Sequence, residues 1–182
     1  MNTNDWFKFF NHTHDIDKLC NSARKYMISE NIKTWQYDHG LVETNSTFWF
    51  KKTLDCLVDF KNILLEIEER LSIPLIHPKT YIGFWEYTNY AKLPLHKDGK
   101  MDESQTILLP LIGKFKTYCH DDDDNIIDSV IYEPGCFGIL NNMKHKHSGE
   151  TISGYRLVLT IMISPEYSVL DNFDKIKDRL HE

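Results

Sequence analysis

The chain has 182 residues, of which 41% are hydrophobic and 26% are charged, and these are the proportions of a globular domain large enough to bury a core. Its formal net charge is −6 and its basic residues are scattered, which argues against a surface for nucleic acid. No apolar run approaches the roughly 20 residues of a membrane-spanning helix, and the first residues lack a signal-peptide pattern. We therefore expect one cytoplasmic domain, spanning residues 1–182, with no membrane contact. The four cysteines show no zinc-binding spacing, so we expect reduced, mostly buried thiols.

The first part of the chain, residues 1–79, is predicted to be a helical buttress. Apolar residues repeat at helical spacing from Ile16 to Met27, and a second apolar stripe follows Lys52 and ends near Leu71. Between them, the aromatic segment Thr34–Phe50 is predicted to be irregular or to form short strands. An apolar helix face must be covered by a partner or by a sheet, and we expect packing on a sheet.

From residue 80 the pattern changes to strands. Six runs rich in aromatic and β-branched residues are separated by turn signals: Thr80–Tyr87, Gln105–Ile112, Lys114–Cys119, Ile126–Tyr132, Cys136–Leu140 and Tyr155–Ile163. Short strands without helical segments between them are typical of an antiparallel sandwich or barrel. Residues 164–182 then show the spacing of one helix. The prediction is a mainly β core at residues 80–163 with flanking helices.

Four consecutive aspartates occupy Asp121–Asp124 and are followed by Asn125. We interpret them as the solvated tip of a hairpin, because clustered like charges favour water. The alternative, a calcium loop, lacks the glycine and the distal glutamate of the EF-hand pattern.

A histidine and an aspartate, His96 and Asp98, close a short apolar run and are followed by Gly99. Side chains two residues apart on an extended chain point to the same side. A second imidazole from a distant strand, either His145 or His147, would complete two histidines and one carboxylate. This ligand set leaves coordination positions open and is typical of non-haem Fe(II) oxygenases.

An arginine, Arg156, lies inside the apolar strand that closes the series. A buried charge is costly unless it is paired, so either a carboxylate of the protein or a bound acid must neutralise it. The planar guanidinium suits bidentate capture of a small carboxylate.

With these residues, the segment 80–163 resembles the Fe(II)- and 2-oxoglutarate-dependent dioxygenases, whose core is a double-stranded β-helix, a cupin-like jelly roll. The resemblance is carried by His96-Lys97-Asp98, the turn Pro134-Gly135 with the strand after it, a distal histidine and Arg156. The short length and the layout look most like the prolyl hydroxylases and the aspartyl/asparaginyl β-hydroxylases.

The resemblance implies that His96, Asp98 and a distal histidine bind Fe(II). Either His147 or His145 could be the distal ligand; the spacing to Arg156 favours His147, and the spacing from the Pro134-Gly135 turn does not decide.

The resemblance further implies that Arg156 binds the far carboxylate of 2-oxoglutarate. Tyr87 and Thr106 would be hydroxyl donors to this co-substrate, or else ordinary strand residues. The implied reaction uses O2, is supported by ascorbate, decarboxylates 2-oxoglutarate to succinate and hydroxylates a C–H bond of a peptide side chain (proline, aspartate or asparagine) or of a small molecule. Two alternatives stay open: a non-catalytic binding module of the same fold with structural histidines, and a metalloenzyme of that fold that does not use 2-oxoglutarate.

Overall fold

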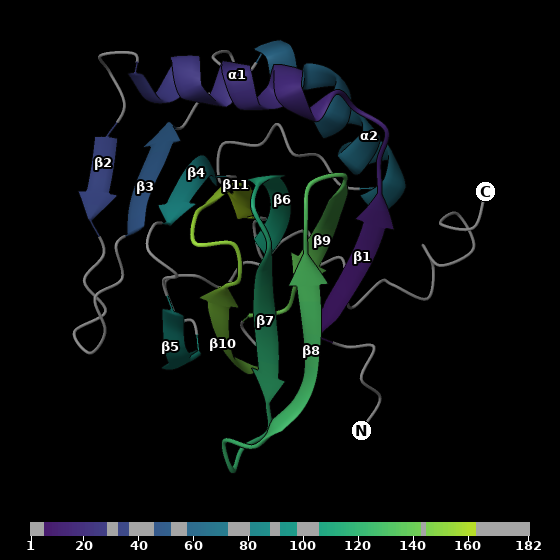
Figure 1. Ribbon diagram of the computed structural model, residues 1–182. Coiled ribbons are helices and arrows are strands. Elements are labelled where there is room, and N and C mark those ends of the chain that lie inside the picture. The colour runs from purple at the N-terminus through teal and green to yellow at the C-terminus, as the bar shows by residue number, and fades with distance from the viewer. Residues whose placement is uncertain are drawn as a thin grey trace.

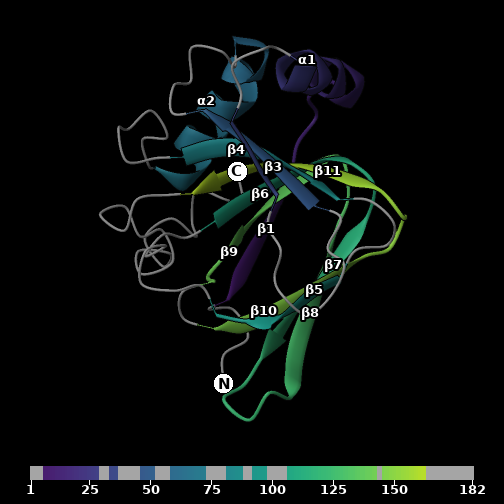
Figure 2. The same cartoon turned by 90° about the vertical axis from the view of Figure 1, so that its left-hand side faces the viewer.

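The structure is a computed structural model, and it describes residues 6–28, 33–36, 46–51, 58–72, 81–87, 92–97, 106–142 and 145–162. The helix expected at residues 164–182 and the expected metal ligand Asp98 lie outside these residues. Two antiparallel sheets face each other, and two helices cover the outer face of the larger sheet (Figures 1 and 2). This mainly β arrangement is a double-stranded β-helix, which confirms the predicted fold class.

The larger sheet has seven strands in the order β1-β9-β6-β11-β4-β3-β2. Their bounds are β1 Phe7–Asn11, β2 Lys33–Gln36, β3 Ser46–Lys51, β4 Tyr81–Tyr87, β6 Thr106–Ile112, β9 Cys136–Leu140 and β11 Arg156–Met162. The smaller sheet has the order β5-β10-β7-β8. Its strands are β5 Lys92–His96, β7 Phe115–His120, β8 Ile126–Tyr132 and β10 Lys146–Thr151.

The helices are α1 (Ile16–Ile28) and α2 (Lys61–Leu71), and a short 3-10 turn, η3 (Val58–Phe60), leads into α2. The apolar stripe of α2 is buried together with strand residues that point to the same side of the larger sheet: Ile63, Leu64, Ile67 and Leu71 with Phe84, Leu109 and Leu159. Each such side chain contributes about 1.5–3 kcal/mol when it leaves water. The helices therefore pack on a sheet, as expected, and the opposite face of that sheet is left to meet the smaller one.

The space between the sheets has its own apolar contacts. The rings of Phe115 and Tyr132 stack at 4.8 Å, and Trp6, which is 1% exposed, packs with Cys119 and Leu140. The indole Nε1 of Trp6 donates to an Asp128 carboxylate oxygen at 3.2 Å. Through these contacts with Asp128 and Cys119, Trp6 connects the start of the described chain to the smaller sheet.

The prediction of a helical first part was incomplete. That part also supplies β1, β2 and β3, which extend the larger sheet at both edges (Figure 1). These strands are four to six residues long, too short for a clear alternation, and β1 pairs with β9 from the distant end of the chain. Thr34–Phe50 was expected to be irregular or to form short strands, and two short strands, β2 and β3, overlap its ends.

Two expectations from composition were tested in the described residues. Cys20, Cys119 and Cys136 are buried, unpaired thiols, as predicted, and burial raises the pKa of Cys119 to about 11. Neither α1 nor α2 combines the length and apolar character needed to cross a bilayer, and no other helix is described that does.

Candidate metal and carboxylate site

The pairing of β5 with β10 brings two histidines together. His96 and His147 are partners in the antiparallel register, and their ring centroids are 4.2 Å apart with the planes tilted by 55°. His147 is buried and His96 is half-buried. Two imidazoles far apart in the sequence therefore meet at one point of the smaller sheet.

The orientation of the His96 ring is fixed by its own strand. Its Nδ1 lies 2.8 Å from the carbonyl oxygen of Pro94. A carbonyl only accepts hydrogen bonds, so Nδ1 carries a proton, and in the neutral ring Nε2 carries the lone pair. This is the tautomer in which an imidazole can coordinate a metal through Nε2, and a backbone carbonyl is a frequent second partner of such histidines.

The third predicted ligand cannot be placed, because Asp98 lies outside the described residues. Within the described residues, no group of three histidine, cysteine, aspartate or glutamate side chains is arranged to hold a metal ion. His145 lies just before β10 begins, and its backbone N–H donates to the carbonyl of Asn141 at 3.4 Å. The register therefore brings His147, and not His145, opposite His96.

Arg156 is the first residue of β11, and its side chain is 6% exposed. Its guanidinium carbon lies 3.6 Å from the ring centroid of Tyr87 and 4.3 Å from that of Phe115. In the described part of the chain no carboxylate forms an ion pair with it, and its Nε has no hydrogen-bond partner there. Burial lowers the pKa of Arg156, and Tyr87 opposes that fall. The guanidinium is thus a buried cation held between two aromatic faces.

The two predicted hydroxyl donors lie in different places. Tyr87 is the register partner of Arg156 on β4 and presents its ring to the guanidinium. Thr106 is opposite Met162, at the other end of β11, about 20 Å away at the usual rise per strand residue. The Thr106 hydroxyl accepts a hydrogen bond from Asn142 Nδ2 at 2.9 Å. The structure therefore brings Tyr87 to the arginine and does not bring Thr106 there.

Two residues of the site were not singled out by the sequence. Gly149 and Thr151 follow His147 at alternate positions of β10, so the three share the face that meets the larger sheet. A Cβ on Gly149 would lie 3.0 Å from the Lys116 carbonyl oxygen and 3.9 Å from Thr117 Oγ1. The Lys116 backbone therefore lies close to Gly149, two residues from His147, and leaves little room for a side chain at that position.

Thr151 is the register partner of Phe115, which in turn contacts Arg156. Its buried hydroxyl has no hydrogen-bond partner among the described residues. The inner face of β10 thus leads from an imidazole, past a position without a side chain, to a hydroxyl near the guanidinium. Side chains at alternate positions of a strand share one face, so counting in steps of two from His147 could have identified Gly149 and Thr151 from the sequence.

No protein-family model matches the chain, and no curated protein matches it. Solved structures do match. A prolyl hydroxylase from Trichoplax adhaerens, in complex with a hypoxia-inducible factor oxygen degradation domain peptide fragment, is 11% identical with a TM-score of 0.63, and the match covers 91% of this chain and 86% of that one. A Pseudomonas putida prolyl-4-hydroxylase is 16% identical with a TM-score of 0.57, and the match covers 86% and 91%. At these identities the likeness shows the shared fold, the double-stranded β-helix of prolyl hydroxylases.

Proposed function

We propose that the protein is an Fe(II)- and 2-oxoglutarate-dependent dioxygenase that hydroxylates a C–H bond and converts 2-oxoglutarate to succinate. The observation that carries the proposal is the pairing of His96 with His147 in a sandwich that also buries Arg156 without an acidic partner among the described residues. The fold that the chain shares with prolyl hydroxylases supports it.

His96, His147 and Asp98 would hold the metal in this proposal. Both described histidines are on paired strands of one sheet, so the backbone ladder sets the distance between their rings. The Pro94 carbonyl keeps His96 in its coordinating tautomer. Bound Fe(II), with O2 and 2-oxoglutarate, would supply the oxidant for the C–H bond.

Arg156 would bind the far carboxylate of 2-oxoglutarate. The faces of Tyr87 and Phe115 fix the plane of the guanidinium and keep water from it, so its N–H groups are oriented before the acid arrives. The buried Thr151 hydroxyl, on the strand that carries His147, would be a further donor to the co-substrate.

The hydroxylated substrate would be a peptide side chain of the proline, aspartate or asparagine type, or a small molecule. The Trichoplax structure contains a peptide, which favours the first class for a chain of the same fold. We retain the cytoplasm as the proposed location and ascorbate as the proposed supporting reductant.

The test is conversion of 2-oxoglutarate to succinate in the absence of a prime substrate, with Fe(II) and ascorbate supplied. We expect slow succinate production, reduced by about 100-fold or more in His96→Ala and in His147→Ala, because each loses a metal ligand. His145→Ala is the matched control and should retain the activity.

Folded, iron-loaded protein that makes no succinate would instead support the non-catalytic binding module. Tight metal binding and a turnover that depends neither on 2-oxoglutarate nor on Arg156 would support the other alternative, a metalloenzyme of this fold that does not use 2-oxoglutarate. If His145→Ala and His147→Ala exchange their outcomes, the distal ligand is His145.

A further inference from the structure

The strand β8 is at one edge of the smaller sheet. Among the described strands it pairs with β7 alone, over the register from Phe115 opposite Tyr132 to His120 opposite Ile126. An edge strand has a row of backbone N–H and C=O groups that can pair with another chain. Proteins usually protect such edges with lysine, proline or a covering segment, and the seven residues of β8 contain neither lysine nor proline.

The side chains of β8 divide between the two faces of the sheet. Asp128 and Tyr132 point inward, toward Trp6 and Phe115. Ile127 and Ile131 occupy the opposite face and are 37% and 49% exposed. Ile126, at the start of the strand, is 58% exposed.

Three of the six exposed large hydrophobic side chains in the described residues therefore lie on this one strand. Exposed apolar residues that occur singly are common. Their concentration along a strand edge that no other described strand covers is typical of an interaction surface.

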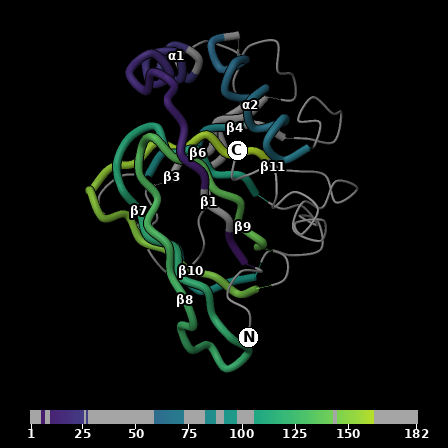
Figure 3. The backbone as a smooth tube through the Cα atoms, turned by 90° about the vertical axis from the view of Figure 1, so that its right-hand side faces the viewer, coloured from purple at the N-terminus to yellow at the C-terminus, as the bar shows by residue number. Residues whose placement is uncertain are grey.

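The hairpin tip before β8 is acidic and projects beyond the sandwich (Figures 1 and 3). The Asp121 carboxylate accepts backbone hydrogen bonds from Asp123 and Asn125, which lowers its pKa, and Asp124 pairs with Lys146 at 2.5 Å. Lys146 also donates to the backbone carbonyl of Asp122 at 3.0 Å.

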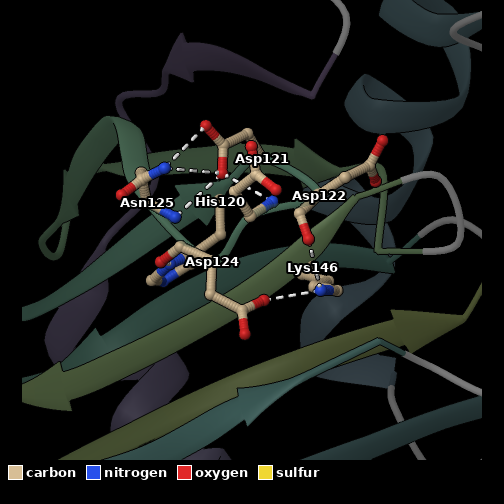
Figure 4. Close-up of polar contacts among 7 residues, drawn as sticks. His120, Asp121, Asp122, Asp124, Asn125 and Lys146 are labelled. Carbon is tan, nitrogen blue, oxygen red and sulfur yellow. Dashed lines mark hydrogen bonds and ion pairs between the residues drawn. The ribbon is translucent and has the colours of Figure 1, made fainter.

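Lys146 forms an ion pair with Asp124 alone, so the other three tip carboxylates have no ion-pair partner among the described residues. The Asp122 side chain points away from Lys146 (Figure 4), and neither Asp122 nor Asp123 forms an ion pair with any described lysine, arginine or histidine. The tip thus keeps a net negative charge beside the start of the exposed strand.

The negative charge of the tip helps to decide whether a second copy of the chain or a basic peptide binds at the edge of β8. A second copy would pair β8 with β8 in antiparallel fashion about a two-fold axis. Each acidic tip would then lie near the far end of the other strand, where Glu133 is already paired with Lys114, and both chains carry a net charge of −6, which opposes their association. A basic peptide instead places cations near Asp122 and Asp123, so charge complementarity favours it.

We infer that the outer edge of β8 is a docking site for an extended, basic segment of another polypeptide, which adds to the smaller sheet as a fifth strand. Its alternate apolar side chains would cover Ile127 and Ile131, and a lysine or arginine at one end would reach Asp122 and Asp123. Backbone pairing would provide affinity, and the apolar and charged positions would provide selectivity. The inference does not require that the proposed oxygenase activity be correct.

The test uses the full-length protein to select from a random decapeptide phage library. We expect enriched sequences to alternate apolar residues and to carry lysine or arginine at one end. Enriched peptides are then synthesised with a fluorophore, and their dissociation constants are measured by anisotropy at two salt concentrations.

Ile131→Lys places a charge on the edge and should weaken binding at least tenfold. Leu65→Lys is the matched control, because Leu65 is a similarly exposed residue on α2 at 46%, and it should leave binding unchanged. The double variant D122N/D123N should weaken binding three- to tenfold and reduce its salt dependence. Thermal unfolding verifies that each variant is folded.

The inference is overturned if no such sequences are enriched, or if Ile131→Lys binds the peptides as well as the parent does. It is also overturned if sedimentation shows a dimer that Ile131→Lys dissociates. That result would assign the edge of β8 to a second copy of the chain.

Discussion

Replacement of Arg156 by methionine should have opposite effects on the ligand-free and ligand-bound protein. Without ligand, the guanidinium is a buried charge that has no acidic partner in the described residues. Exchange of a buried charge for an apolar side chain is neutral to stabilising by about 1–4 kcal/mol. The lost contacts with Tyr87 and Phe115, each about 0.5–2 kcal/mol, offset part of this gain. We expect Arg156→Met to be at least as stable as the parent when no ligand is present.

When 2-oxoglutarate is present, the parent protein should become more stable than Arg156→Met. Loss of a buried, charge-assisted pair costs about 2–5 kcal/mol, which weakens binding by about 30-fold or more. The assay is thermal unfolding with Mn(II), with and without 2-oxoglutarate. At about 100 times its dissociation constant the ligand adds roughly 2.7 kcal/mol, which raises the Tm of a domain of this size by about 5–10 °C. The variant should show little of this rise.

Arg70→Met provides the control for this experiment. Arg70 is a half-buried arginine on α2 that pairs with Glu66 at 2.7 Å, and loss of such a pair costs about 1 kcal/mol or less. This variant should keep the full response to 2-oxoglutarate. The reasoning is refuted if Arg156→Met loses more than about 3 kcal/mol without ligand, or if it keeps the rise in Tm.

Two further predictions concern stability. Gly113 has φ +78°, and a Cβ there would lie 2.1 Å from the Tyr155 carbonyl oxygen, so the free energy of unfolding of Gly113→Ala, measured in urea, should fall by about 3 kcal/mol or more. Gly135 has φ +97° with open space around it, so Gly135→Ala should lose only about 1–2 kcal/mol, and equal losses in the two variants would contradict the steric argument. Burial, and then His14, lowers the pKa of His12, so the unfolded chain takes up a proton first, and the free energy of unfolding should decline as the pH falls below about 6.5. His12→Asn keeps an acceptor for the His14 backbone N–H and should flatten that decline; an unchanged decline would assign it to other groups.

The strands of the sandwich were largely predictable because their composition is so distinct. β6 and β11 are near-continuous apolar runs. Arg156 is the single charged residue of β11, and it could be proposed as a functional residue because burial of an unpaired charge is unfavourable. Helix α1 was predictable from its apolar spacing. His96 and His147 could be proposed as partners only from the chemistry of a ligand set, because no local pattern records that β5 pairs with β10.

Features that depend on distant contacts were not predictable. The short β1 joins the larger sheet because β9 is beside it, and the position of Trp6 between the sheets depends on Asp128. Gly149 matters through the atoms that an added side chain would meet, which the sequence does not reveal. Thr106 lies opposite the end of β11 that is distant from Arg156, and this position along the neighbouring strand was not visible in the sequence.

The pairing of His96 with His147 closes a loop of about fifty residues, and β1 reaches its partner β9 across more than a hundred. Such a chain has a high contact order, and topologies of this kind fold in milliseconds to seconds. During translation the two imidazoles cannot align until β10 has left the ribosome. Any metal captured by this pair is therefore acquired only after β10 has been made and paired with β5, and its uptake would report that this part of the smaller sheet has formed.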